Sequence, residues 1–187
     1  MIRRPALLGL TALLVLAAAL PSGATTVIGK DLDDLCREAD RIFLGKVVAS
    51  ESRHDASTQS IETVVTFAVL EPILGDVGDE VSLAFPGGEV GALRQVVHGM
   101  PVFALGEEVV VFTRSGPFVS PLVGFHQGGL RVTSRDGSRY VSRPEERRRG
   151  RPLRAESPDA EGELVPLDEL LDDVRRRLPA EHPGEAQ

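Results

Sequence analysis

Residues 61–71 constrain the fold most, because a strand here would be apolar on both faces. Alternate positions carry Val65, Phe67 and Val69 on one side, and the other side holds Val64, Thr66, Ala68 and Leu70. A strand that is apolar on both faces must be covered on both faces. The sequence therefore predicts that residues 61–71 lie centrally in a β domain.

Other segments predict strands that surround this one. Residues 79–85 alternate cleanly, with Val81, Leu83 and Phe85 facing inward. Residues 41–50 form a predicted long strand with imperfect alternation, and the apolar run 109–113 is short enough to be a buried strand. Gly45 indicates a bulge within residues 41–50. Residues 121–126, 128–133 and 139–142 form a predicted meander, and the Asp136-Gly137 pair favours a hairpin. We expect loops at 51–60 and 89–101 and a break at Pro72.

The composition agrees with a small, mainly β domain. The chain has 13 prolines, 19 glycines and no tryptophan, which favours short strands joined by turns over a helical bundle. Its formal charge is −7 and becomes −9 if Arg3 and Arg4 are removed with a signal peptide. Such an acidic chain argues against nucleic-acid binding.

Residues 1–24 have the three parts of a secretory signal peptide. Two arginines precede an apolar run over residues 6–20, and small residues end at Ala24. The alternative is an uncleaved membrane anchor, but the run is shorter than the roughly 18–20 residues that a spanning helix needs. We therefore expect a secreted or periplasmic protein that begins at Thr25 and keeps no stable membrane anchor.

Two helices are predicted at the ends of the mature chain. Asp31 can cap a helix over residues 32–39, which carries Cys36 on its apolar face. As the one cysteine of the chain, Cys36 is expected to be a buried side chain rather than a reactive thiol or a bridge to another chain. The second helix, residues 164–178, has an apolar stripe made of Leu167, Leu170, Leu171, Val174 and Leu178.

The second helix follows a segment of different character. Residues 143–163 are rich in Arg, Pro, Glu, Asp and Ala and are predicted to be a disordered linker, and residues 179–187 a disordered tail. The apolar stripe must be buried, either against the body of the same chain or against a partner protein.

We find no catalytic constellation and no metal site in the sequence. His54, His98, His126 and His182 have none of the close spacings that zinc ligands take, and no Gly-x-Ser-x-Gly string is present. The glycine pairs do not open helices and lack the lysine of a phosphate-binding loop. The sequence predicts a protein that is not an enzyme and has no cofactor.

Residues 35–47 resemble the opening of the netrin-like domains, which include the tissue inhibitors of metalloproteinases. A cysteine is followed there by a small residue, an aspartate and a strand that ends in Lys-Val, as at Cys36, Ala39, Asp40 and Lys46-Val47. Residues 66–75 are similar to the second strand of that family and its glycine turn, and residues 107–112 to a later strand. The chain is also similar to exported bacterial proteins with Ala-Asp-x-Ile-Phe and Pro-Gly-Gly features.

The resemblance implies a small OB-like Greek-key β-barrel over residues 25–142. It also implies that the new N-terminus could contact a protease zinc through the α-amine and carbonyl of Thr25, with Thr26 beside it. The 89–101 loop, with His98, Gly99 and Met100, is the second expected contact.

These features lead to two hypotheses for the function. In the first, the chain is an exported, non-catalytic protein-binding module whose partner is a protein such as a zinc metalloprotease. In the second, it is a structural or assembly protein of the cell envelope that docks through residues 164–178.

Overall fold

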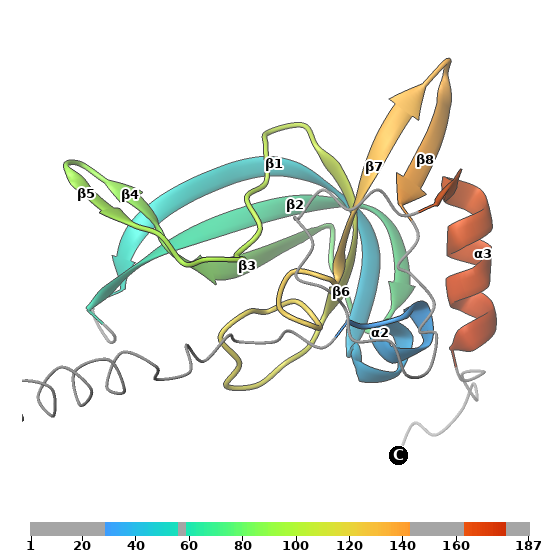
Figure 1. Cartoon of the computed structure of the whole chain (residues 1–187), viewed down its shortest axis with the longest axis horizontal. Coiled ribbons are helices and arrows are strands. Elements are labelled where there is room, and N and C mark those ends of the chain that lie inside the picture. Colours follow the sequence, from blue (N-terminus) through green and yellow to red (C-terminus); the bar gives the residue numbers. More distant parts are fainter. Residues whose placement is uncertain (1–28, 56–58, 143–162, 179–187) are drawn as a thin grey trace, which may run out of the picture.

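A computed structural model describes residues 29–55, 59–142 and 163–178 (Figure 1). Its elements are, in order, α2 (Leu32–Glu38), β1 (Arg41–Asp55), β2 (Ser60–Leu74), β3 (Glu80–Pro86), β4 (Gly88–Val90), β5 (Leu93–Gln95), β6 (Glu108–Thr113), β7 (Gly129–Arg135), β8 (Ser138–Ser142), β9 (Leu164–Pro166) and α3 (Leu167–Arg177). The signal peptide, Thr25, Thr26 and most of the predicted linker and tail lie outside these residues.

Seven strands form one antiparallel sheet in the order β3-β2-β1-β6-β7-β8-β9, and β4 and β5 form a separate hairpin. The prediction of a mainly β fold with a helix near each end is confirmed. The expected closure into a barrel is not seen in the described residues. Strand β7 pairs with β8, and β8 pairs with β9. Because β7 does not pair with β3, the sheet is open.

The hairpin of β1 and β2 is longer than the sequence predicts. Pairing continues to Asp55 opposite Ser60, so the expected loop at residues 51–60 is wrong for most of its length. Polar side chains pair across the strands there. The hydroxyls of Ser52 and Thr63 are 2.9 Å apart, and Arg53 Nε lies 2.7 Å from Glu62 Oε1. Polar cross-strand pairs stabilise a two-stranded ribbon even where no apolar periodicity reveals it.

Gly45 and Pro72 lie at irregular places in this hairpin. The register shifts between Leu44 and Gly45, as the bulge prediction requires. A Cβ at Gly45 would lie 2.9 Å from the Phe43 ring, so only glycine fits without movement. Pro72 does not break β2, because the pairing with β3 ends at Ala68 and the proline therefore lies where, among the described residues, β2 has no neighbouring strand on that side.

The sheet separates two apolar cores. Ile42 and Leu44 face one core, and Phe43 and Val47 face the other. Strand β6 alternates in the same way, with Val110 and Phe112 on the first side and Val109 and Val111 on the second. The alternation follows from the period of two along a strand. Both faces of β6 and of the first part of β1 are therefore buried. On β2 only the side of Val65 and Phe67 is buried in a core and Leu70 is 47% exposed, so the prediction that residues 61–71 are covered on both faces is wrong.

Helices α2 and α3 cover the first core. Asp31 caps α2 by accepting a hydrogen bond of 2.8 Å from the Asp34 N–H, as predicted. The predicted second helix begins three residues later than expected, since Leu164–Pro166 pair with β8 as strand β9. Neither described helix is long and apolar enough to cross a membrane.

The structure differs from two other predictions. Residues 89–101 are not a plain excursion, because they contain the β4–β5 hairpin. Residues 121–126 form turns and a single bridge, Thr113 to Leu122, where a strand was predicted. The Asp136-Gly137 hairpin is confirmed, with both residues at positive φ, as a type I′ turn requires.

We predict that Leu170→Ala lowers the free energy of unfolding by about 2–5 kcal/mol, because Leu170 is fully buried between α3 and the sheet. Chemical denaturation monitored by circular dichroism would measure this. Asp172→Ala is the matched control. It removes only an exposed ion pair with Arg175 and should change stability by about 0.5 kcal/mol or less. Equal effects of the two changes would mean that α3 is not part of the folded core.

Candidate functional site

The second core is covered by coil. Residues 96–107, which follow β5, and residues 114–128, which follow β6, each contribute to it, and they are drawn in yellow-green and yellow in Figure 1. The second segment also contributes Val123 to the first core. Phe103 from the first segment and Leu122 from the second belong to this core. The segments also approach each other, since a Cβ on Gly99 would lie 3.3 Å from the Phe125 ring. We call residues 96–107 and 114–128 together the loop layer.

Phe103 anchors the first segment. Its ring lies 5.4 Å from the rings of both Phe67 on β2 and Phe85 on β3, edge-on to the former and tilted to the latter. The side chain is buried. A buried phenylalanine in a cluster of aromatic rings contributes both apolar burial and favourable ring geometry. The coil around Phe103 is therefore attached to the sheet.

The turn after Phe103 is hydrogen-bonded to itself and to β1. The Ala104 N–H donates to Glu107 Oε2 at 2.9 Å, and the Glu107 N–H donates to the Ala104 carbonyl at 3.1 Å. Gly106 donates to the Val47 carbonyl at 2.8 Å, and Val47 donates to that of Glu107 at 2.9 Å. Gly106 has a φ of +82°, which favours glycine. The turn therefore extends the pairing of β1 to Val47, which bonds to both Gly106 and Glu107.

Arg131 on β7 holds the same turn from the other side. Its Nε lies 2.5 Å from Glu107 Oε1, and its Nη2 donates to the Val102 carbonyl. An exposed ion pair of this kind adds little to stability. Its effect is geometric, because one guanidinium fixes both ends of the Val102–Glu107 turn.

The fixed turn presents apolar side chains to solvent. Val102 is 82% exposed and Leu105 is 70% exposed, and Val96, earlier in the same segment, is 62% exposed. Single exposed apolar residues are ordinary on protein surfaces. Here three of them lie in one segment that is attached to the sheet by Phe103, Arg131 and Val47. Such side chains lose little conformational freedom when they bind.

The second segment of the loop layer is built in a similar way. Phe118 and Val119 are exposed. The Arg114 guanidinium lies 3.6 Å above the centre of the Phe118 ring, a cation–π contact that fixes the ring. Ser120 donates to the Phe125 carbonyl at 2.5 Å, and the Arg114 N–H donates to that of Pro121 at 3.1 Å. These bonds close the segment around its buried apolar residues, Leu122 and Val123.

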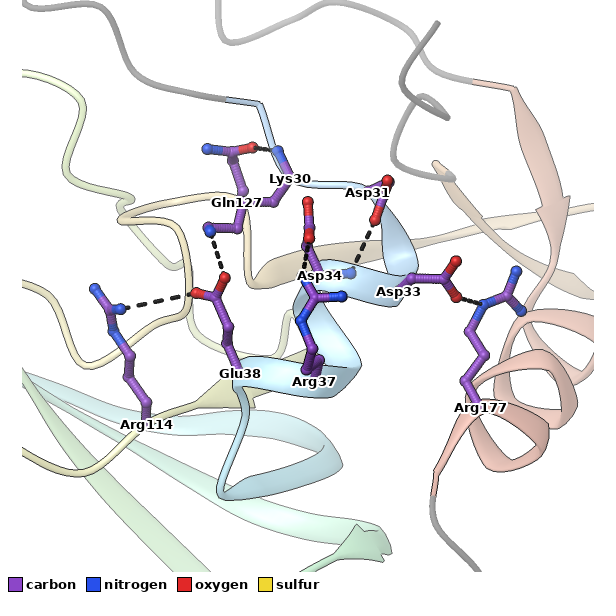
Figure 2. A network of polar contacts seen from close by, with 9 residues as sticks. All are labelled: Lys30, Asp31, Asp33, Asp34, Arg37, Glu38, Arg114, Gln127 and Arg177. Atoms are coloured by element: carbon purple, nitrogen blue, oxygen red, sulfur yellow. Dashed lines mark hydrogen bonds and ion pairs between the residues drawn. The ribbon is translucent and has the colours of Figure 1, made fainter. Parts of the chain in front are cut away.

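The described chain begins against this second segment (Figure 2). The Lys30 N–H donates to Gln127 Oε1 at 2.5 Å, and the Lys30 ammonium lies 2.6 Å from Glu38 Oε1 on α2. Arg114 is the second cation near Glu38, at 3.9 Å. Glu38 therefore holds both the N-terminal segment and the start of the 114–128 segment. The described chain therefore begins beside the 114–128 segment.

Other charges around α2 have structural roles. Asp34 pairs with Arg37 within the helix, and Asp33 on α2 lies 2.5 Å from Arg177 on α3 (Figure 2). The second contact joins the two helices. In the described parts of the chain, no group of three or more His, Cys, Asp or Glu side chains could hold a metal ion.

Of the binding residues predicted from the sequence, His98, Gly99 and Met100 lie in the loop layer. His98 and Gly99 are exposed, and Met100 is partly buried against the second core. Thr25 and Thr26 lie outside the described residues. The structure brings Lys30 and Gly99 to neighbouring parts of one segment, since Lys30 contacts Gln127 and Gly99 approaches Phe125.

The stripe proposed for a partner helix is buried within the chain. Leu167, Leu170, Leu171 and Val174 are nearly or fully inaccessible, and Leu178 is partly buried against the same core. The first of the two alternatives, packing against the body of the chain, is the arrangement found. A partner could reach this stripe only if α3 left the sheet.

Burial shifts the pKa of two titratable side chains. Burial raises the pKa of Cys36 to about 11, so the thiol is protonated at neutral pH and is a poor nucleophile. Burial lowers the pKa of His126, whose Nδ1 has no hydrogen-bond partner among the described residues. Asp40 has a lowered pKa because the Ser115 backbone N–H and side chain donate to its carboxylate. None of the three lies in a cluster that suggests catalysis.

The sequence did not indicate Val102, Leu105, Phe118 or Val119. A short apolar run such as Val102–Leu105 does not reveal which of its side chains point outward, because coil has no fixed period. The available signal was the arrangement around Phe103, where apolar residues lie between Pro101 and Gly106 and outside any predicted strand. No family model, no curated protein and no solved structure matches this chain.

We predict that His126→Gln reduces the loss of stability on acidification. Folded His126 resists protonation, whereas the unfolded chain takes up the proton below its usual pKa of 6.5. The free energy of unfolding therefore falls as the pH drops below 6.5 and levels off below the folded pKa. Denaturation from about pH 7.5 to about pH 5.5 would measure this. His98→Gln is the control, because His98 is an exposed histidine in the same layer. This variant should lose stability on acidification as the wild type does. If His126→Gln also lost stability like the wild type, His126 would be excluded as the source of the loss.

Proposed function

We propose that this protein is an exported, non-catalytic protein-binding module that contacts its partner through the loop layer. The observation that carries this proposal is the Val102–Glu107 turn, in which two highly exposed apolar side chains are held by a buried phenylalanine, an arginine and two hydrogen bonds to β1. Fixed apolar side chains on a rigid support are typical of binding hot spots. Export rests on the signal peptide predicted at residues 1–24.

The N-terminal segment extends the proposed surface. Lys30 is held by Gln127 and Glu38, which fixes the start of the described chain beside the 114–128 segment. In the netrin-like inhibitors that the sequence resembles, the N-terminal arm is held by disulfides. Here Cys36 is the one cysteine of the chain, and the contacts of Lys30 would take the place of that attachment.

The resemblance suggests a zinc metalloprotease as the class of partner. The α-amine and carbonyl of Thr25 would contact the zinc, and the loop layer would pack against the protease surface. The order β3-β2-β1-β6-β7, with the long β1 pairing with β2 throughout and with β6 over its first half, supports relating this sheet to an open OB-type Greek-key barrel. Likeness of fold alone does not establish function, so the partner needs a direct test.

The test has two parts. Crosslinking followed by affinity capture from the native envelope fraction, with the chain from Thr25 onwards as bait, would identify the partner. Inhibition of that partner, if it is a zinc protease, would then be measured before and after the α-amine of Thr25 is blocked. Inhibition that survives blocking would exclude contact with the zinc through the α-amine, and capture of envelope structural proteins alone would exclude the protease proposal.

We predict that the double change Val102→Asp with Leu105→Asp weakens binding of the captured partner at least about tenfold, because it places charge where apolar contact is expected. Both side chains are largely exposed, so the free energy of unfolding should change by about 0.5 kcal/mol or less. Titration calorimetry or surface plasmon resonance would measure the affinity.

Leu164→Asp is the matched control for this double change. It also places a carboxylate at an exposed leucine, but on β9, at the edge of the sheet opposite β3. Binding should be unchanged. Loss of binding in Leu164→Asp with retention in the double variant would move the binding surface to the side of α3 and favour the envelope-assembly hypothesis.

A further inference from the structure

Strand β3 is one of the two edges of the sheet, and no strand pairs with its outer side among the described residues. An open edge offers unpaired N–H and C=O groups to any other extended chain. Natural proteins usually protect such edges with charged residues, proline, bulges or short length.

The backbone groups that face outward on β3 follow from its hydrogen bonds to β2. The Val69 N–H donates to the Asp79 carbonyl at 2.8 Å, and the Gly87 N–H donates to that of Ile61 at 2.7 Å. Both pairs share the register that places Val65 opposite Leu83. Hydrogen-bonded pairs alternate along an antiparallel ladder. Every second residue from Asp79 to Gly87 therefore bonds to β2.

The residues between them turn their backbone groups away from β2. These are Glu80, Ser82 and Ala84, each with an outward N–H and C=O, and Pro86, which has a C=O only. Their side chains are exposed or partly exposed, whereas Val81, Leu83 and Phe85 are buried in the second core. Six outward donor and acceptor groups on three residues make a complete template for one more strand.

The protection of this edge is weak. Glu80 is the one charged residue in β3, and Pro86 lies at its end, so Ser82 and Ala84 are flanked only by apolar residues. Other open edges differ. The distal part of β1 carries Glu51, Arg53, His54 and Asp55, and β9 has three residues and ends in a proline.

We propose that the outer edge of β3 pairs antiparallel with the same edge of a second copy of this chain, so that two sheets join across a twofold axis. An edge is complementary to itself in the antiparallel direction, which is the direction a twofold axis imposes. With the axis at Leu83, Ser82 of one copy faces Ala84 of the other, and Val81 faces Phe85. Glu80 then faces Pro86. With the axis at Ser82, Glu80 faces Ala84.

The charges on β3 favour this occupant in both registers. No acidic side chain faces another within the paired strands, so like-charge repulsion across them is avoided. The apolar rows of Val81, Leu83 and Phe85 adjoin each other on the same side of the joined sheet. The proposal is independent of the partner suggested for the loop layer, because it uses β3 alone.

Sedimentation velocity of the chain from Thr25 onwards, which contains every described element, tests the proposal between about 10 μM and about 1 mM. We expect the mass to change from one chain to two as the concentration rises. Amide hydrogen exchange measured by NMR at both ends of this range locates the interface. The Ser82 and Ala84 amides should be slow only at high concentration, whereas those of Val81 and Leu83 should be slow at both.

Ala84→Pro removes one outward N–H at an edge position where proline is tolerated. It should raise the dissociation constant of the dimer at least about tenfold. Ala84→Ser keeps the N–H and should dimerise like the wild type. If Ala84→Pro does not fold, the exchange measurement on the wild-type chain decides the question.

Two results would overturn the proposal. One is a single-chain mass at every concentration together with fast exchange at Ser82 and Ala84, which is also what the purified chain would show if this edge pairs only with a different protein. The other is a dimer in which these two amides still exchange quickly, because the contact would then lie elsewhere.

Discussion

The structure depends on strand β1 being apolar on both of its faces. Ile42 and Leu44 need cover on one side of the sheet, and Phe43 and Val47 need it on the other. A chain of this size has few elements to supply both covers. Helices α2 and α3, from opposite ends of the described chain, cover one face together with Val123 of the loop layer, and Phe103 and Leu122 of the loop layer pack on the other.

The helices and the loop layer present different surfaces to solvent. An amphipathic helix that buries its apolar stripe has its polar face left over, and α3 accordingly presents Arg175 to Glu71 and Arg177 to Asp33. Coil has no such period, so an apolar anchor such as Phe103 can be followed directly by outward apolar residues. This difference explains why exposed apolar side chains gather over the second core and not over the helices.

The sequence predicted those parts of the fold in which the apolar pattern and the structure share a period. The inward residues of β3, the buried β6, the cap at Asp31, the bulge at Gly45 and the hairpin at Asp136-Gly137 are all found. The extension of β1 beyond residue 50 was missed, because residues 51–55 are polar and their pairing becomes visible only when the strands are placed side by side. The open sheet was missed because pairing between distant strands leaves no local signal. The anchor of Lys30 depends on Gln127, far away in sequence, and for the same reason could not be predicted.

Strand β9 has a further consequence for how this chain tolerates change. Ser142 and Leu164 lie opposite each other in the β8–β9 pair, so the segment between them starts and ends at the same place on the sheet. Both ends are held by strand pairing within the described residues, and closing a loop costs only about 0.6 kcal/mol more for each doubling of its length. A tag, a reporter or a folded domain inserted between Ser142 and Leu164 would therefore leave β9 paired with β8 and α3 in the first core.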